Sequence, residues 1–278
     1  MRKNILALAL FAFCGANALE IQEFKGFSHP ESVYVDQNTV YVSNVGKKLA
    51  PLDKDNDGFI SKLDSNGKIL ELEFIKNLHA PKGMSKIGNT LYVVDIDVVY
   101  GFDVVNKKEV FKLPINNAVF LNDIAVLNDD VLLVSDTGTG YIHKVYLKTK
   151  KYENFIHLDP KYGGPNGLLV DQNSLLVAGY DPSDKSGGKV ICIDLQSKKI
   201  QELSSKIEQF DGIVYDKNKN LLVSSWGKNL QGYIYKIKDN KEEKLKLDYI
   251  QGPADIFFDG EYLWVPKMAE NAIVKIKL

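Results

Sequence analysis

Short apolar stretches recur along the chain with polar turns between them. Six segments each hold an apolar strand, a polar turn and a second strand rich in Val, Leu and Tyr. They begin at Pro30, Pro81, Leu121, Pro165, Phe210 and Pro253, at intervals of 51, 40, 44, 45 and 43 residues. Each unit continues with a third strand, such as "YIYKIKD", and the first five add a fourth, such as "KEVFKLP". Four strands per repeat at this period predict an all-β fold, a six-bladed β-propeller.

The sixth repeat is short by one strand, because it stops after its third strand at Leu278. Near the other end, the segment "LEIQEFKGF" from Leu19 supplies a spare strand. We expect this N-terminal strand to complete the sixth blade and close the ring, since closure hides sheet edges that would otherwise stay open. The alternative is an open sandwich of many strands, but sandwiches do not repeat at this period.

The first eighteen residues lie outside this pattern. The segment "MRKNILALALFAFCGANA" has a basic start, a short apolar run and an Ala-Asn-Ala cleavage site, which is typical of a secretory signal peptide and too short for a membrane span. We predict a signal peptide over 1–18, a propeller over 19–278, and a periplasmic or secreted protein. Cys14 raises the alternative of a lipid anchor, but Phe13 stands where that signal needs a small residue.

Composition narrows the range of partners. The formal net charge of −1 gives no reason to expect a nucleic-acid partner. After cleavage one cysteine would remain, Cys192, so no internal disulfide can form, and its apolar strand "KVICIDL" predicts a buried, inert thiol. We expect a monomer with a small-molecule ligand or substrate. The chain has no G-x-S-x-G motif and no phosphate-binding loop of the Walker type.

Candidate chemistry gathers where the inner strands begin. In a propeller the first strand of each blade lines the central channel, so the residues that open these strands converge on the axis. One residue after each anchor stand Glu31, Lys82, Asn122, Asn166, Asp211 and Ala254. Two carboxylates and two carboxamides from four blades predict an axial site for Ca²⁺, with Mg²⁺, Mn²⁺ or Zn²⁺ as alternatives. The competing interpretation is four ordinary turn residues, because Asn-Asp, Asn-Gly and Asp-Gly are common in turns.

Four motifs carry a family resemblance. They are "PESVYVD", "LNDIAV", "PNGLLVD" and "FDGIVYD". Together they resemble the six-bladed propellers that include regucalcin (senescence marker protein) and the gluconolactonases, with the paraoxonases as more distant relatives. The resemblance covers essentially all of the predicted mature chain. It implies that Glu31, Asn122, Asn166 and Asp211 are metal ligands and that the protein is a metal-dependent hydrolase of a lactone or ester.

One departure from the family pattern concerns the substrate. Members that cleave sugar lactones have an arginine two residues before the asparagine of the Asn-Asp pair, and this chain has Phe120 there. We therefore expect a less charged ligand than a sugar acid, or no catalysis.

The predicted reaction needs a base and a cation. A divalent ion can polarise an ester carbonyl and lower the pKa of bound water, and a nearby carboxylate can accept the proton. Asp211 is the candidate base by resemblance, and Asp123 is the second. Lys82 could stabilise an oxyanion or bind an anionic group, or could be a solvated charge at the channel mouth. The second function class is a non-catalytic propeller that binds a ligand or partner around a structural axial calcium, and it predicts a covered channel.

A second acidic motif lies in the first repeat. The segment "DKDNDGFISKLD" has the spacing of an EF-hand calcium loop, but strands rather than helices flank it. It falls between the second and third strands, on the same face as the axial residues. We predict a second calcium site, whose ligands would be Asp53, Asp55, Asp57, the carbonyl of Phe59, and Asp64. The alternative is an acidic surface turn.

Overall fold

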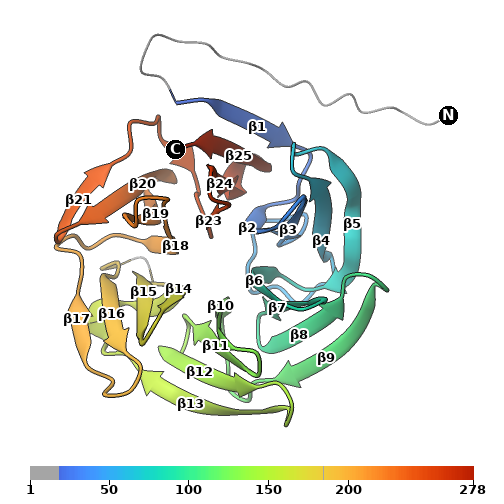
Figure 1. Cartoon of the computed structure of the whole chain (residues 1–278), viewed down its shortest axis with the longest axis horizontal. Coiled ribbons are helices and arrows are strands. Elements are labelled where there is room, and N and C mark those ends of the chain that lie inside the picture. The colour runs from blue at the N-terminus through green and yellow to red at the C-terminus, as the bar shows by residue number, and fades with distance from the viewer. Residues whose placement is uncertain (1–18, 184) are drawn as a thin grey trace.

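The computed structural model describes residues 19–183 and 185–278, so the predicted signal peptide lies outside the described residues. Six antiparallel sheets surround a central axis (Figure 1). This arrangement confirms the all-β, six-bladed propeller predicted from the repeat. Within the described part of the chain, no helix has both the length and the apolar character needed to cross a membrane.

Five blades follow the chain outward from the axis. Blade 1 contains β2 (Pro30–Asp36), β3 (Thr39–Asn44), β4 (Gly58–Asp64) and β5 (Ile69–Leu78). Blade 2 contains β6 (Pro81–Ile87), β7 (Thr90–Asp95), β8 (Val98–Asp103) and β9 (Lys108–Pro114). Blade 3 contains β10 (Leu121–Asn128), β11 (Val131–Asp136), β12 (Tyr141–Tyr146) and β13 (Lys151–His157). Blade 4 contains β14 (Gly164–Asp171), β15 (Ser174–Tyr180), β16 (Val190–Asp194) and β17 (Ile200–Glu202), and the turn η1 (Pro160–Tyr162) precedes it. Blade 5 contains β18 (Phe210–Tyr215), β19 (Leu221–Lys228), β20 (Gln231–Lys238) and β21 (Lys241–Lys244), with β22 (Ile250–Gln251) beside β20.

The sixth blade joins the two ends of the described chain. From the axis outward it contains β23 (Phe257–Phe258), β24 (Tyr262–Lys267), β25 (Ala272–Lys277) and β1 (Ile21–Lys25), with η2 (Met268–Glu270) between β24 and β25. β1 pairs antiparallel with β25, from Ile21 opposite Ile276 to Lys25 opposite Ala272. Figure 1 shows β1 lying along β25 at the rim. The N-terminal strand therefore closes the ring, as predicted.

The apolar core is divided among the junctions between blades. Six apolar clusters of the described residues each join two neighbouring blades; for example, Val42 and Leu63 of blade 1 pack with Trp264 of blade 6. Second strands such as β11, "VLLVSD", are apolar at consecutive positions because neighbouring blades cover both faces of each sheet. The thiol of Cys192, predicted to be buried, is half-buried.

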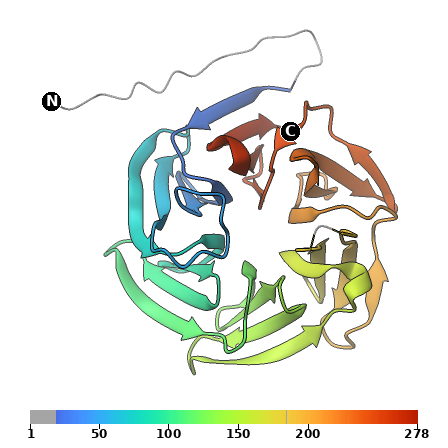
Figure 2. The ribbon, with the colours of Figure 1, turned by 180° about the vertical axis from the view of Figure 1, so that it is seen from behind.

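Each of the first five inner strands begins with a β-bulge. In blade 2, Pro81 pairs with Asp95 and the next pair is Met84 with Val93. Between these two pairs β6 has two intervening residues and β7 has one, so β6 carries one extra residue. The same extra residue follows the anchors of β2, β10, β14 and β18. A bulge locally re-aims side chains. Seen from either side, these inner strands border the axis (Figures 1 and 2). We call the face at which they begin the upper face.

Candidate metal centre

The bulged positions carry the predicted ring residues. Glu31, Lys82, Asn122, Asn166 and Asp211 come from β2, β6, β10, β14 and β18, and each side chain is no more than 3% exposed. Neighbouring inner strands approach closely here. A Cβ on Gly167 would lie 2.1 Å from the carbonyl oxygen of Asp211, so only glycine fits between β14 and β18.

Each of the four predicted metal ligands has a buried oxygen without a hydrogen-bond partner in the described structure. These atoms are Glu31 Oε2, Asn122 Oδ1, Asn166 Oδ1 and Asp211 Oδ1. Only seven buried side-chain polar atoms of the described chain lack a partner, so four of the seven belong to one ring. Buried polar atoms are normally paired, and an exception calls for an explanation such as a bound ion. Four unpaired hard oxygens fit a calcium-like cation.

The two carboxylate oxygens of Asp211 have different environments. Its Oδ2 accepts a hydrogen bond of 2.7 Å from Trp226 Nε1, while Oδ1 has no partner. Burial raises the pKa of Asp211 to about 7, and the charge of Asp123 adds to this, whereas the hydrogen bond from Trp226 and the nearby Asn166 side chain oppose it. The carboxylate is therefore held in one orientation with one oxygen free.

Glu31 experiences the combined charge of the channel. Burial is the main cause that raises its pKa well above the usual range. The charges of Asp211 and Asp255 raise it further, whereas Lys82 lowers it. Buried like charges are costly unless an opposite charge lies nearby. The ring would thus gain stability from a cation.

A second tier of acids lies one residue deeper. Asp123 accepts backbone hydrogen bonds of 2.6 Å from both Ile124 and Leu168, so it links blade 3 to blade 4. Asp255 accepts a hydrogen bond of 2.5 Å from the hydroxyl of Ser32, which links blade 6 to blade 1. With both oxygens of Asp123 engaged, Asp211 is the better placed of the two predicted bases.

Lys82 lies in the ring but is fully buried rather than solvated. Its Nζ donates to the carbonyl oxygen of Ala80 over 2.8 Å and lies 5.1 Å from the centre of the Phe120 ring. Phe120 therefore stands where the family resemblance expects an arginine, and its ring packs against the ammonium group of Lys82 from the neighbouring blade.

The acidic loop lies on the upper face, between β3 and β4, as predicted. Asp55 accepts a hydrogen bond of 3.4 Å from the amide of Asp57, and Asp57 accepts one of 3.2 Å from the amide of Lys47. Asp53 and Asp55 are exposed, and Phe59 pairs with Asn44 inside the sheet. The described residues contain no cluster of three or more His, Cys, Asp or Glu side chains with metal-binding spacing, in this loop or elsewhere.

Asp64 does not belong with this loop. It ends β4, and its Oδ1 accepts hydrogen bonds of 2.9 and 3.0 Å from the amides of Asn66 and Lys68 in the turn on the opposite face. A strand rises about 3.4 Å per residue, so the length of β4, about 20 Å, separates Asp64 from the start of the strand. Asp64 instead stabilises the turn that leads into β5.

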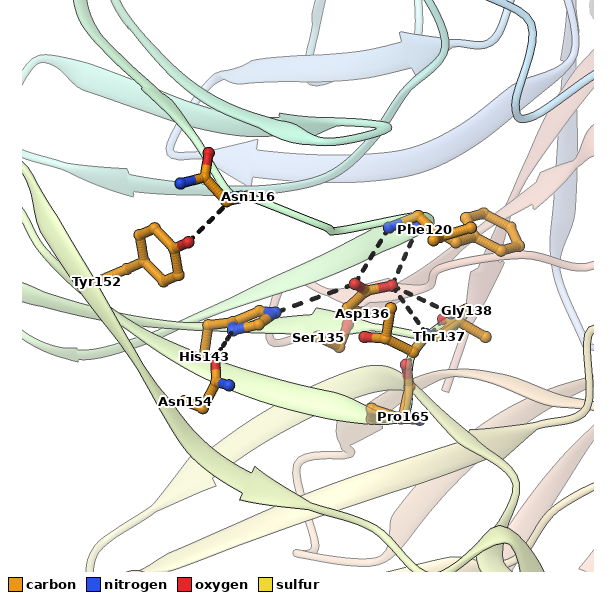
Figure 3. A network of polar contacts seen from close by, with 12 residues as sticks. Asn116, Phe120, Ser135, Asp136, Thr137, Gly138, His143, Tyr152, Asn154 and Pro165 are labelled. Carbon is orange, nitrogen blue, oxygen red and sulfur yellow. Dashed lines mark hydrogen bonds and ion pairs between the residues drawn. The ribbon is translucent and has the colours of Figure 1, made fainter.

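Two kinds of supporting residue were not predicted. Trp226, which orients Asp211, lies in β19, the second strand of blade 5, and no spacing in the sequence points to it. Asp136 accepts backbone hydrogen bonds of 3.2 and 3.0 Å from Val119 and Phe120, and so holds the segment that leads into β10 (Figure 3). Asp95 does the same for His79 and Ala80 before β6. The shared position of Asp95 and Asp136 at the ends of second strands was the available signal.

Comparisons with known proteins identify the fold but not a family. No protein-family model matches the chain, and no curated protein matches it. Membership of the regucalcin and gluconolactonase family therefore stays a prediction from the four motifs.

Solved propellers resemble the whole described chain. A virginiamycin B lyase from Staphylococcus aureus has a TM-score of 0.65 at 17% identity, covering 94% of this chain and 100% of that chain. A streptogramin B lyase has a TM-score of 0.64 at 16% identity, covering 93% and 98%. A chain of the nidogen/laminin complex has a TM-score of 0.60 at 11% identity, covering 85% and 84%. At these identities the likeness shows the propeller fold alone, which serves both enzymes and binding proteins.

Proposed function

We propose that the protein is a periplasmic or secreted propeller that binds a divalent cation, calcium first, on its axis and hydrolyses a lactone or ester there. The observation that carries this proposal is the set of four unpaired, buried oxygens, one from each of four blades. Glu31, Asn122, Asn166 and Asp211 would hold the cation. When bound, it would polarise the substrate carbonyl and make a water molecule more acidic.

The chain's own contribution to hydrolysis is the placement of Asp211. Trp226 holds Oδ2, so Oδ1 is the oxygen that can accept a proton from the attacking water. A general base must be fixed within reach of the proton that it takes. Lys82 and Phe120 would line the same end of the channel.

A second candidate function is a non-catalytic propeller in which the axial cation is structural. The observation in its favour is the deep burial of all four ligand side chains, each at most 3% exposed. Such a protein would bind its ligand or partner on a face of the ring.

A substrate screen separates the two functions. The chain from Leu19 to Leu278 is tested against aliphatic lactones, aryl esters and sugar lactones, with calcium, with chelator, and with calcium restored. The hydrolase proposal expects turnover of at least one substrate that chelator abolishes and calcium restores. No turnover of any of them, in a protein that binds calcium, would contradict hydrolysis and favour the structural cation.

A further inference from the structure

The axial channel holds an excess of negative charge. Four carboxylates are buried around it, those of Glu31, Asp123, Asp211 and Asp255. Among the described residues of the inner strands, Lys82 is the one buried lysine. It lies at the same bulge position as the predicted cation ligands, so the ring that would hold a cation already includes one positive charge.

The ammonium group of Lys82 is held in place without an ion pair. Within residues 19–183 and 185–278, no carboxylate oxygen lies within 4.0 Å of its Nζ. The carbonyl oxygen of Ala80 and the ring of Phe120 hold it instead. Both residues are themselves fixed, because Asp95 binds the amide of Ala80 and Asp136 binds the amide of Phe120.

We propose that Lys82 is a fixed counter-charge that sets how tightly the axial ring binds cations. In the cation-free protein the ammonium group of Lys82 offsets the charge of Glu31. When a cation binds, the same ammonium group repels it and so weakens binding. This inference depends on the proposed cation site and adds to it a residue that limits the affinity of that site.

The electrostatics of the channel favour this role. Glu31 and Lys82 hold the same bulge position on β2 and β6, the inner strands of neighbouring blades, so the two charges lie on adjacent walls of the channel. Burial lowers the pKa of Lys82 to about 8, with Glu31 and Asp95 opposing, so the side chain is still mostly charged at neutral pH. Because the repulsion between two charges grows as the dielectric falls, a buried ammonium beside the ring costs a bound cation more than a surface lysine would.

The test compares cation affinities of the wild type and Lys82→Met. Calorimetric titration of metal-free protein with calcium should show binding about tenfold tighter, or more, in Lys82→Met. Lys82→Arg keeps the charge and should bind calcium as the wild type does. Lys275→Met is the matched control, since Lys275 is a buried lysine that also contacts an aromatic ring, Tyr262, in the outer part of blade 6. Its removal should leave the affinity unchanged.

A trivalent ion sharpens the test. Because repulsion is proportional to the charge of the ion, the gain in log affinity for lanthanum should be about one and a half times the gain for calcium. If Lys82→Met proves too unstable to titrate, Lys82→Gln gives the same comparison. Unchanged or weaker calcium binding in the neutral variants would overturn the role of Lys82. Absence of cation binding in the wild type would instead overturn the proposed cation site, so the two failures are distinct.

Discussion

At the scale of single residues, the two oxygens of Asp211 have different environments. One accepts a hydrogen bond from Trp226, and the other is buried without a partner. A carboxylate that is oriented on one side and free on the other suits both cation binding and proton transfer. Substitutions of Asp211 can therefore separate cation binding from proton transfer.

Changing Asp211 should affect metal binding and turnover differently. Asp211→Asn keeps the shape and an oxygen ligand but has no base at neutral pH, so turnover should fall at least about 100-fold while a cation still binds. Asp211→Ala removes the ligand too, so calcium affinity should fall as well. Steady-state kinetics on a substrate from the screen, with calorimetry, measures both.

The matched control is Asp259→Asn, because Asp259 accepts the same hydrogen bond of 2.7 Å from an indole, that of Trp264, in the turn between β23 and β24 on the face opposite the ring residues. It should keep wild-type affinity and turnover. Turnover near the wild-type rate in cation-loaded Asp211→Asn would remove Asp211 as the base and favour Asp123.

The sequence predicted the ring residues because each stands one position after a repeat anchor. It did not predict what surrounds them. The bulge that aims Glu31 toward the axis leaves no mark in the apolar pattern, and Trp226 comes from a different part of its blade. Asp64 was misplaced because EF-hand spacing was read across a strand that extends away from the loop.

At the scale of elements, the segments between blades are held by acids at the ends of second strands. Asp136 accepts four backbone hydrogen bonds, from Val119, Phe120, Gly138 and Thr139. Loops rely on such side-chain acceptors because they lack a sheet ladder. This acid fixes the entry to β10, and hence Phe120 beside Lys82.

Removing this acceptor should destabilise the propeller. Asp136→Ala leaves four backbone amides without their acceptor and opens a gap at a fully buried side chain, so it should cost about 3 kcal/mol in the free energy of unfolding. Urea unfolding at pH 7 measures this cost, and a loss below about 0.5 kcal/mol, the range usual for surface substitutions, would contradict it.

The contribution of Asp136 should also depend on pH. Burial raises its pKa, but the polar side chains of His143 and Thr139 nearby and the backbone amides of Phe120 and Val119 outweigh this, so the net shift is downward. A lowered folded-state pKa means that the stabilisation is full above the unfolded-state pKa of about 4 and is lost as pH falls through the folded-state pKa. Asp136→Asn should therefore lose less stability than the wild type between pH 5 and pH 2. Equal losses would show that the charge of Asp136 contributes nothing.

The acidic loop gives a second prediction for a single element. If it binds calcium, the double variant Asp53→Ala and Asp55→Ala should lose one calcium equivalent in calorimetric titration and keep the axial one. Asp64→Ala is the matched control, because Asp64 lies on the opposite face, and it should keep both equivalents. An unchanged stoichiometry in the double variant would make the loop an acidic surface turn.

At the scale of the whole molecule, one short strand joins the ends of the ring. β1 contributes five backbone pairs to β25 and stacks Phe24 on Trp264 at 6.1 Å. The apolar clusters lie between blades, so an open ring would also expose apolar surface at the junction of blades 6 and 1.

Truncation measures the value of closure. A chain that starts at Gly26 should melt about 10 °C or more below one that starts at Leu19, because it loses the β1 ladder and exposes the edge of β25. Thermal unfolding followed by circular dichroism makes the comparison. Equal melting temperatures would mean that β1 does not contribute to the stability of the propeller.

The period of the repeat was sufficient to predict this architecture. Six anchors at similar intervals predicted the blades, and the missing outer strand of the last repeat predicted the role of β1. The tight approach of β14 to β18 at Gly167 was not predictable, because it depends on neighbouring blades rather than on local pattern.

Occupation of the axis by a divalent cation can be observed in a crystal grown with calcium. Anomalous diffraction recorded at long wavelength locates calcium ions. We expect a peak about 2.3–2.6 Å from Glu31 Oε2, Asn122 Oδ1, Asn166 Oδ1 and Asp211 Oδ1. A map without that peak, in which water molecules donate hydrogen bonds to these four oxygens, would contradict the proposed cation site.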